Sequence, residues 1–141
     1  MKYILDTCVV SEFTRPEPEP RVVAWVGAVP EDDLAVSALT LGEARFGIAR
    51  MTPGRRQREL TEWLERLERQ FAPRVLGVDH DVARRWAIVR AAAATRGRAI
   101  PVVDGLIAAT ALHHGLTIVT RNGTDFAATG AAVVDPWKHG A

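Results

Sequence analysis

Short apolar segments alternate with longer segments of helical periodicity along the whole chain. The apolar segments have the length of strands and lie at residues 2–5, 34–36, 75–78, 117–119 and 132–134. Between most of them, apolar residues recur three and four positions apart, the spacing that places them on one face of a helix. Repeated strand–helix–strand units with short connections predict a parallel sheet with helices packed on its faces. The expected fold class is therefore α/β.

Punctuating residues define where the helices should begin and end. The expected helices run from Asp6 to Thr14, from Val22 to Gly27, from Ser37 as N-cap to about Met51, from beyond Gly54 through Phe71, from Asp79 or Asp81 through Ala93, and from Asp104 to His114. The segment 15–20 cannot be helical on this interpretation, because its three prolines fix φ and favour extended geometry in the residues before them. A loop is expected after residue 119, through Gly123.

Length and composition place the chain among ordinary soluble domains. With 141 residues it is expected to form one domain, residues 1–141, with a sizeable core. The formal net charge of +1 is too small to indicate nucleic-acid binding by bulk electrostatics. Cys8 is the only cysteine, which excludes an intrachain disulfide and fits a reducing compartment. Asp6 and Glu12 interrupt any signal-peptide pattern, and no apolar run has membrane-spanning length, so a cytoplasmic location is expected.

Four acidic residues occupy positions where an ordinary surface role is hard to explain. They are Asp6, Glu43, Asp104 and Asp125. Three of them directly follow a strand-like segment or open the helix after one. In a parallel sheet such positions converge at the carboxyl ends of the strands, where ligands bind. Because four converging carboxylates repel one another unless a cation lies between them, the pattern predicts a divalent metal site.

The all-carboxylate composition of this group indicates which metal and which chemistry. Mg²⁺ and Mn²⁺ prefer oxygen ligands. Metal-dependent hydrolysis of a phosphodiester needs an activated water on one side of phosphorus and stabilisation of the leaving oxygen on the other, and two ions about 3.5–4 Å apart supply both. No protein histidine is then needed as the base. The four histidines agree with this interpretation, because none shows paired spacing with the acids.

Four sequence motifs resemble those of the PIN domain, and within it the VapC-like ribonuclease toxins of type II toxin–antitoxin systems. The motifs are Ile4-Leu5-Asp6-Thr7-Cys8-Val9-Val10-Ser11-Glu12, Val36-Ser37-Ala38-Leu39-Thr40-Leu41-Gly42-Glu43, Val103-Asp104-Gly105-Leu106-Ile107-Ala108-Ala109-Thr110-Ala111, and Thr120-Arg121-Asn122-Gly123-Thr124-Asp125-Phe126. They occur in order and span essentially the whole chain.

The resemblance implies a fold, an activity and partners. The implied fold is a three-layer α/β/α domain with a central parallel sheet. The implied activity is an Mg²⁺- or Mn²⁺-dependent endoribonuclease that acts on RNA as a toxin, is inhibited by a cognate antitoxin, and forms a homodimer. By motif, the metal-site carboxylates are Asp6, Glu43, Asp104 and Asp125. Thr120 corresponds to the hydroxyl residue that supports the site, and Asn122 to the loop residue that shapes it.

Cys8 departs from the family pattern, which usually has Asn at this position. An Asn side chain would order the turn after Asp6 through hydrogen bonds, whereas a thiol is at best a weak donor. We expect Cys8 to be a small buried residue, with the turn held by Thr7 and Ser11 instead. The alternative is that a thiol near the metals makes the activity sensitive to oxidation or to soft metals.

Two other function classes fit parts of the pattern. A phospho-acceptor receiver-like domain also binds Mg²⁺ through acids at strand ends, but it needs paired acids at the first strand and a late lysine, and Lys138 follows no expected strand. A non-catalytic PIN-like interaction module would have lost some of the four acids, and all four are present. Mg²⁺- or Mn²⁺-dependent cleavage of RNA that EDTA stops distinguishes a nuclease from both.

Several further residues carry weaker expectations. Glu12 is either a group supporting the acids or a solvated acid of the first helix. The arginines of segment 55–58 are candidates for contact with RNA phosphates or with a partner. Val10 and Phe13 are expected to be exposed and, with the long helix after Gly54, to form a groove for an antitoxin helix. The antitoxin is also expected to place a basic side chain among the acids, where it mimics the cation.

Overall fold

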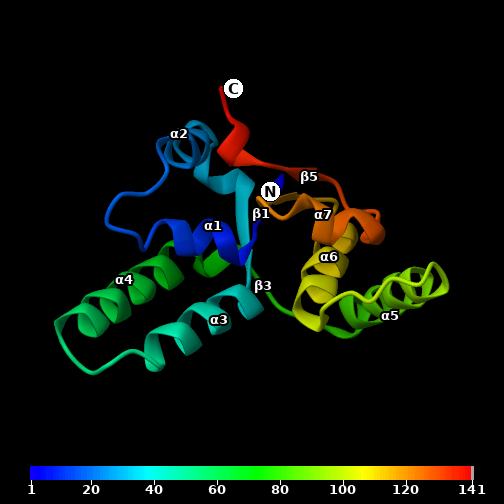
Figure 1. Cartoon of the computed structure of the whole chain (residues 1–141), viewed down its shortest axis with the longest axis horizontal. Helices are drawn as coiled ribbons and strands as arrows, with labels where there is room; N and C mark the ends of the chain where they lie inside the picture. Colours follow the sequence, from blue (N-terminus) through cyan, green and yellow to red (C-terminus); the bar gives the residue numbers. More distant parts are fainter. Residues whose placement is uncertain (141) are drawn as a thin grey trace.

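The protein folds around a five-stranded, fully parallel sheet. The computed structural model describes residues 1–140. The strands are β1 (Tyr3–Leu5), β2 (Leu34–Ser37), β3 (Val75–Leu76), β4 (Thr117–Val119) and β5 (Val133–Val134). Their order in the sheet is β3-β2-β1-β4-β5, and every neighbouring pair is parallel. All five expected strands are present, which confirms the predicted α/β class (Figure 1).

Helices connect successive strands. The helices are α1 (Thr7–Glu12), α2 (Pro20–Ala28), α3 (Ala38–Ala49), α4 (Arg55–Phe71), α5 (His80–Thr95), α6 (Val102–His114) and α7 (Gly123–Phe126). Single 3₁₀ turns lie at Glu31–Asp33 (η1), Ala72–Arg74 (η2), Ala127–Thr129 (η3) and Pro136–Lys138 (η4). None of the helices within residues 1–140 has the combined length and apolar character needed to cross a bilayer.

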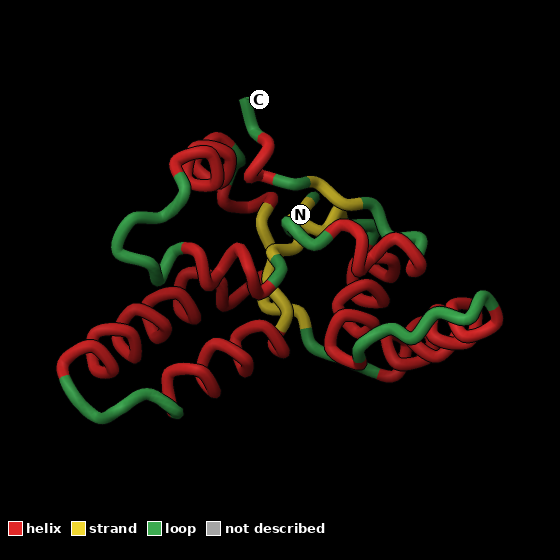
Figure 2. The backbone as a smooth tube through the Cα atoms, in the orientation of Figure 1, coloured by secondary structure: helices red, strands yellow, loops and turns green. Residues whose placement is uncertain are grey.

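The sheet is the middle of three layers, because its side chains alternate between two faces. Leu5, Val36 and Val119 pack with buried side chains of α1 to α4 into one core cluster. Ile4 and Ile118 point the other way and form a second cluster with apolar residues of α6 and with the buried Phe126 of α7. α5 lies against α6 and completes the second helical layer. The strands accordingly run between two groups of helices (Figure 2), as the predicted three-layer architecture requires.

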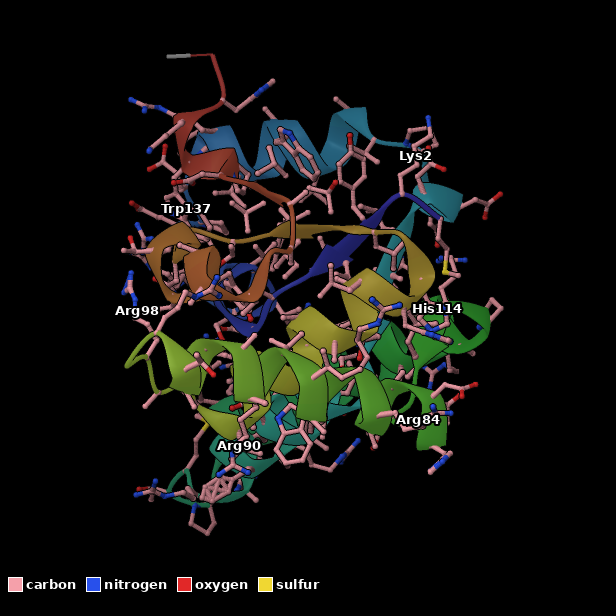
Figure 3. The ribbon with its side chains drawn as sticks, turned by 90° about the vertical axis from the view of Figure 1, so that its right-hand side faces the viewer. Lys2, Arg84, Arg90, Arg98, His114 and Trp137 are labelled. Atoms are coloured by element: carbon pink, nitrogen blue, oxygen red, sulfur yellow. The ribbon has the colours of Figure 1, made fainter. Side chains whose placement is uncertain are left out.

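The strand order places a topological switch point at the middle of the sheet. Tyr3 of β1 pairs with Leu34 of β2 on one side and with Thr117 of β4 on the other. The chain therefore leaves β1 toward one edge of the sheet and later crosses to the opposite side. The strands run from the side of Lys2 toward the side of Trp137 (Figure 3). Ligands of open parallel sheets bind at the carboxyl ends beside such a point.

Local signals in the sequence correctly locate several helix ends. The Ser37 side chain accepts a hydrogen bond from the Leu39 N–H and caps α3, and Asp79 rather than Asp81 caps α5 through the Val82 N–H. α6 stops at Gly115, whose φ of 68° lies in the left-handed region that favours glycine.

Other boundaries differ from the prediction. Pro20 begins α2 instead of ending a loop, because the first helical position needs no N–H donor and has the φ of proline. α6 begins at Val102, so Asp104 lies inside its first turn instead of opening the helix. The predicted loop after β4 contains the short helix α7 at Gly123–Phe126. α1 and α3 also end two residues early, and β3 has only two residues.

Candidate active site at the carboxyl edge of the sheet

Asp6 is the most firmly held of the four acids. It ends β1, caps α1, and is only 5% exposed. Its Oδ1 accepts a hydrogen bond from the Thr7 N–H at 2.8 Å, and its Oδ2 accepts one from Thr120 Oγ1 at 2.8 Å. Such bonds fix the orientation of the carboxylate. The apolar run of β1 therefore delivers one oriented carboxylate to the centre of the carboxyl edge.

Thr120 links this carboxylate to the loop after β4. Its side chain is fully buried, and its Oγ1 accepts a hydrogen bond from the Asn122 N–H at 3.0 Å. Since the hydroxyl accepts from Asn122, its single proton is free for Asp6. The predicted supporting residue therefore does contact the first acid, and Asn122 participates through its backbone.

Glu43 reaches the same edge from α3, the helix that follows β2. It is exposed, and its Oε1 accepts a hydrogen bond from Thr7 Oγ1 at 2.7 Å. Thr7 thus holds two acids at once, Asp6 through its backbone N–H and Glu43 through its side chain. Contacts between α1 and α3 bring the start of α1, at Thr7, beside the middle of α3, at Glu43.

Asp104 lies half-buried in the first turn of α6, on the other side of β1. Burial raises the pKa of its carboxyl group above the ordinary value, and the negative charges of Asp6, Asp125 and Glu43 raise this pKa further. The three other acids are therefore close enough to act on Asp104 electrostatically. The structure thus places the four predicted acids at the same edge of the sheet, within reach of one another's charge.

Asp125 completes the group from α7. It is exposed, and its backbone N–H donates to the Asn122 carbonyl at 2.9 Å, which closes the turn that begins the helix. Phe126, the next residue, is buried under the sheet with α6. This anchored phenyl ring explains why the short helix forms, and the exposed Asp125 beside it is close enough for its charge to act on Asp104.

The donor set suits a hard divalent cation, since all four side chains are carboxylates. Repulsion from the other three acids helps to raise the Asp104 pKa, and a bound cation would relieve this repulsion. The acids surround the edge loosely, however. Within residues 1–140 no three His, Cys, Asp or Glu side chains are arranged closely enough to hold a metal ion.

Cys8 lies beside both the first acid and its supporting hydroxyl. Its Sγ donates to Asp6 Oδ2 at 3.6 Å and lies 3.5 Å from Thr120 Oγ1. Burial raises the pKa of the thiol, although hydrogen bonds from Thr120 and the Arg121 N–H oppose the shift. The side chain is half-buried, so the expected burial is only partly observed. The turn is held by Thr7 and Thr120, and the proposed contribution of the Ser11 side chain is wrong for the described residues.

Glu12 has a structural role that sequence reasoning missed. Its side chain is 4% exposed, so it is not a solvated acid. It accepts a hydrogen bond from the Glu19 N–H at 2.9 Å and pairs with Arg15 at 3.0 Å. The hydrogen bond from the Glu19 N–H contributes most to lowering the pKa of the Glu12 carboxyl group, and Arg15 lowers this pKa further. Glu12 therefore ties the end of α1 to the start of α2.

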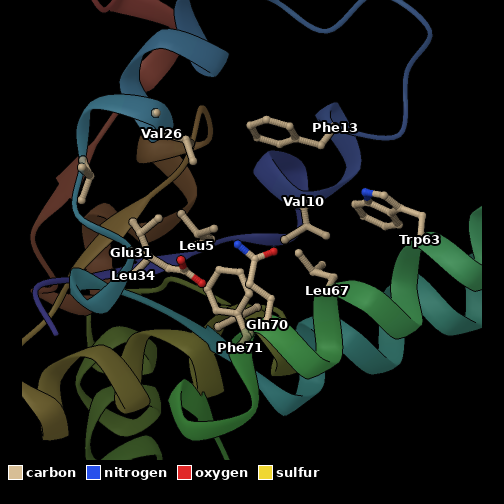
Figure 4. Close-up of a pocket in the computed structure, with 13 residues that line it drawn as sticks. Leu5, Val10, Phe13, Val26, Glu31, Leu34, Trp63, Leu67, Gln70 and Phe71 are labelled. Carbon is tan, nitrogen blue, oxygen red and sulfur yellow. The ribbon is translucent and has the colours of Figure 1, made fainter.

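An apolar groove of about 530 Å³ lies on the α1, α2 and α4 side of the sheet (Figure 4). Its lining includes Val10, Phe13, Trp63, Leu67 and Phe71. Val10 is 4% exposed and Phe13 is half-buried, so the expectation that these two residues are exposed is wrong, although both side chains line the groove. The apolar positions of α1 and α4 do combine in one groove, as expected.

A second, smaller hollow lies between this groove and Glu43, one of the four acids. It is lined by residues of α1, α3 and α4 that include Val10 and Trp63 of the groove and also Thr7 and Glu43 of the acidic edge. Shared lining residues make the two hollows neighbours.

Comparison with known proteins identifies the family. Residues 3–132 of the chain match the family described as "PIN domain". "Toxin FitB" of Neisseria gonorrhoeae is 43% identical over 135 residues, which cover 95% of this chain and 97% of that protein. "VapC ribonuclease Y4jK" of Sinorhizobium fredii is 41% identical over 139 residues, 96% of this chain and 97% of that protein. The structure titled "Crystal Structure of FitAcB from Neisseria gonorrhoeae" superposes with a TM-score of 0.92 at 42% identity and covers 96% of this chain and 99% of that one. The resemblance seen in the four motifs is thereby confirmed, and the chain belongs to the PIN domain family.

Proposed function

We propose that this protein is the endoribonuclease toxin of a toxin–antitoxin pair and that it hydrolyses RNA phosphodiesters with Mg²⁺ or Mn²⁺. The observation that carries the proposal is the meeting of Asp6, Glu43, Asp104 and Asp125 at the switch point of the sheet. Relatives of nearly full length are named as a toxin and as a VapC ribonuclease. Membership of the PIN family over residues 3–132 also leaves the receiver-like alternative without support.

Each side chain has a definite task in this proposal. The four carboxylates would hold the divalent cation, which when bound supplies positive charge to the phosphate and acidifies a water. Thr120 and the Thr7 N–H hold Asp6 in its orientation, and Thr7 Oγ1 positions Glu43. Mg²⁺ usually keeps several of its waters, so a loose arrangement of acids is compatible with such an ion.

Cleavage of RNA tests the nuclease assignment directly. Purified protein should cut single-stranded RNA with Mg²⁺ or Mn²⁺, and EDTA should stop the reaction. Asp104→Asn should remove most of the activity, whereas Asp81→Asn, a change of an exposed acid on α5, should not. Cleavage that survives EDTA, or an Asp104→Asn variant as active as wild type, would refute the metal site. Absence of any cleavage would favour the non-catalytic module.

The antitoxin is expected to occupy the apolar groove with an amphipathic helix. A solved relative from Mycobacterium tuberculosis, at 28% identity and a TM-score of 0.69, is a member of the VapBC family of toxin–antitoxin systems. The hollow shared through Val10 and Trp63 opens on Glu43. A basic side chain of the bound helix could therefore pass from the groove to the acids, where its charge would substitute for the cation.

Substitutions in the groove test this partner assignment. Phe13→Ser and Trp63→Ala should weaken binding of the small protein encoded beside this gene while leaving RNA cleavage largely intact. Ile88→Ser, which changes an exposed apolar residue of α5 outside the groove, provides the matched control. Growth arrest on expression of the chain alone, relieved by co-expression of the neighbouring gene, is the expected phenotype. No arrest and no binding would exclude the toxin role even with the nuclease intact.

A homodimer is part of the same proposal. Phe46 on α3 and Val102 at the start of α6 are 56% and 55% exposed, and these two helices carry Glu43 and Asp104. Burying such side chains against a second copy would remove apolar surface from water beside the acidic edge. Sedimentation should show a dimer that Phe46→Ser weakens, and a strict monomer would contradict this part of the proposal.

A further inference from the structure

Arg121 carries a guanidinium group with free hydrogen-bond donors in the loop after β4. The residue is exposed, and its guanidinium carbon lies 4.3 Å from the centre of the Trp137 ring. This is the shortest of the four cation–π distances within residues 1–140. No carboxylate of the described chain lies within ion-pair distance of Arg121. One face of the group is thus supported while its N–H edge remains available.

Trp137 is itself a fixed platform. Its backbone N–H donates to Asp135 Oδ1 at 2.9 Å, and its carbonyl accepts from Arg21 of α2 at 3.1 Å. Its ring packs against the core cluster that lies under α1 to α4. Trp137 also follows the segment 3–132 that matches the PIN family. Trp137, which follows the matched segment, therefore supports Arg121, which lies within it.

Arg121 lies immediately beside the proposed metal site. Its two sequence neighbours are Thr120, which donates to Asp6, and Asn122, whose N–H donates to Thr120. Trp137 lies at the carboxyl-end side of the sheet, opposite Lys2 (Figure 3). The backbone of Arg121 therefore lies beside the edge that carries the acids, and its guanidinium is anchored on Trp137, where its positive charge also acts on the Glu12 carboxylate.

We infer that Arg121, held against Trp137, binds a backbone phosphate of the RNA next to the one that is cleaved. This inference rests on the proposed ribonuclease function. A guanidinium presents several N–H donors in one plane and binds phosphate oxygens edge-on, so stacking its face on a ring leaves this edge unobstructed. Prior immobilisation by Trp137 also reduces the conformational entropy lost when the phosphate binds.

Such a contact addresses a problem that the four acids create. Without a counter-charge, an anionic rim repels the phosphates on either side of the cleavage position. A fixed cation at one rim attracts the strand and defines on which side of the metal site it continues. Phosphate contacts position a nucleic acid without reading its bases, so Arg121 should affect RNAs of different sequence alike.

The salt dependence of RNA binding provides the decisive measurement. A fluorescein-labelled single-stranded RNA should be titrated with wild type, Arg121→Ala and Arg84→Ala in EDTA, at several salt concentrations. Arg121→Ala should bind about tenfold more weakly, and the slope of log K against log salt should fall by about 0.7, the value for one lost phosphate contact on a single strand. Arg84, an exposed arginine of α5 away from Trp137 in Figure 3, is the matched control and should change neither quantity.

Further variants separate phosphate binding from a purely structural stack. Arg121→Lys keeps the charge and should recover part of the affinity, whereas Trp137→Ala should weaken binding without changing the salt slope. With Mg²⁺, Arg121→Ala should raise KM by about the same factor and leave kcat within about twofold. An unchanged affinity and slope in Arg121→Ala, or a wild type that binds no RNA, would overturn the inference. If wild type binds RNA with these effects but cuts none, only the proposed ribonuclease activity fails.

Discussion

Thr120 Oγ1 donates a hydrogen bond to Asp6 Oδ2 over 2.8 Å and so joins the ends of the adjacent strands β4 and β1. The same oxygen accepts the Asn122 N–H. One buried hydroxyl therefore orients a carboxylate and shapes the loop that carries Arg121 and leads to Asp125.

Removing this hydroxyl should damage both stability and activity. Thr120→Val leaves Asp6 Oδ2 and the Asn122 N–H without this partner in a buried place, and such losses typically cost about 1–3 kcal/mol of unfolding free energy. RNA cleavage should fall strongly because Asp6 loses its orientation, while Thr120→Ser should restore most of both properties. Urea unfolding and cleavage assays measure the two effects. Thr95→Val removes a hydroxyl that makes one exposed hydrogen bond, to the Ala91 carbonyl of the same helix, and should be nearly neutral. Equal losses at both positions would contradict this role of Thr120.

Neutralising Asp104 should stabilise the metal-free protein while abolishing its function. Burial and the charges of Asp6, Asp125 and Glu43 disfavour the ionised form of this carboxyl group. Asp104→Asn should therefore melt at a higher temperature than wild type in EDTA, yet lose its activity and the stabilisation that Mn²⁺ gives wild type by mass action. Thermal melts with EDTA and with Mn²⁺ decide the question. Identical melting temperatures in EDTA, or an undiminished metal effect, would remove Asp104 from the cluster.

The stabilising effect of Asp104→Asn should depend on pH in a defined direction. Because the folded-state pKa of Asp104 is raised above its ordinary value of 3.8, the folded protein retains this proton up to a higher pH than the unfolded chain does. Below pH 3.8 the group is protonated in both states, so wild type and variant should be similarly stable. As pH rises through the window between the ordinary and the raised pKa, wild type should lose stability relative to the variant. If the difference in melting temperature between Asp104→Asn and wild type shrank with rising pH, this prediction would be contradicted.

Glu12→Gln should show the opposite pH dependence. The Glu19 N–H, with Arg15, lowers the folded-state pKa of Glu12 below its ordinary value of 4.5. The ionised carboxylate therefore stabilises the fold above pH 4.5, and this contribution disappears as pH falls through the lowered pKa. At neutral pH the variant should melt below wild type, and the gap should close in acid. Glu65→Gln, at an exposed site on α4, should have little effect at any pH.

Cys8 should behave as a slowly reacting thiol. Burial raises its pKa above the ordinary 9.0, so the reactive thiolate is scarce at neutral pH. Alkylation by iodoacetamide, followed by mass spectrometry, should be much slower in the folded protein than in urea and should accelerate only as pH rises above 9. Cys8→Ser keeps a donor for Asp6 and should retain activity. Alkylation at equal rates in the folded and unfolded chain would instead support the alternative of a reactive thiol near the metals.

Features with a local cause were predictable from the sequence. Ser37 and Asp79 cap their helices through N–H groups two and three residues away, and Gly115 ends α6 where the chain needs a left-handed residue. The four acids could be grouped because strand periodicity placed them at strand ends or in the helices that follow. Short helices were harder to predict: α7 depends on Phe126 packing against α6 and the sheet, a contact that its four residues do not encode.

Contacts between distant residues depended on the tertiary structure. Asp6 and Thr120 are 114 positions apart, and Thr7 and Glu43 are 36 apart, so these pairs meet only because β1 lies between β2 and β4. The stacking of Arg121 on Trp137 also joins residues that are separate along the chain, whereas Glu12 finds its partners nearby, at Arg15 and Glu19. The sequence by itself determined the α/β class, the helix caps and the four acids, since these follow from periodicity and from hydrogen bonds between near neighbours. Only the tertiary structure decided which side chains orient those acids, because the order of the strands in the sheet selects the partners.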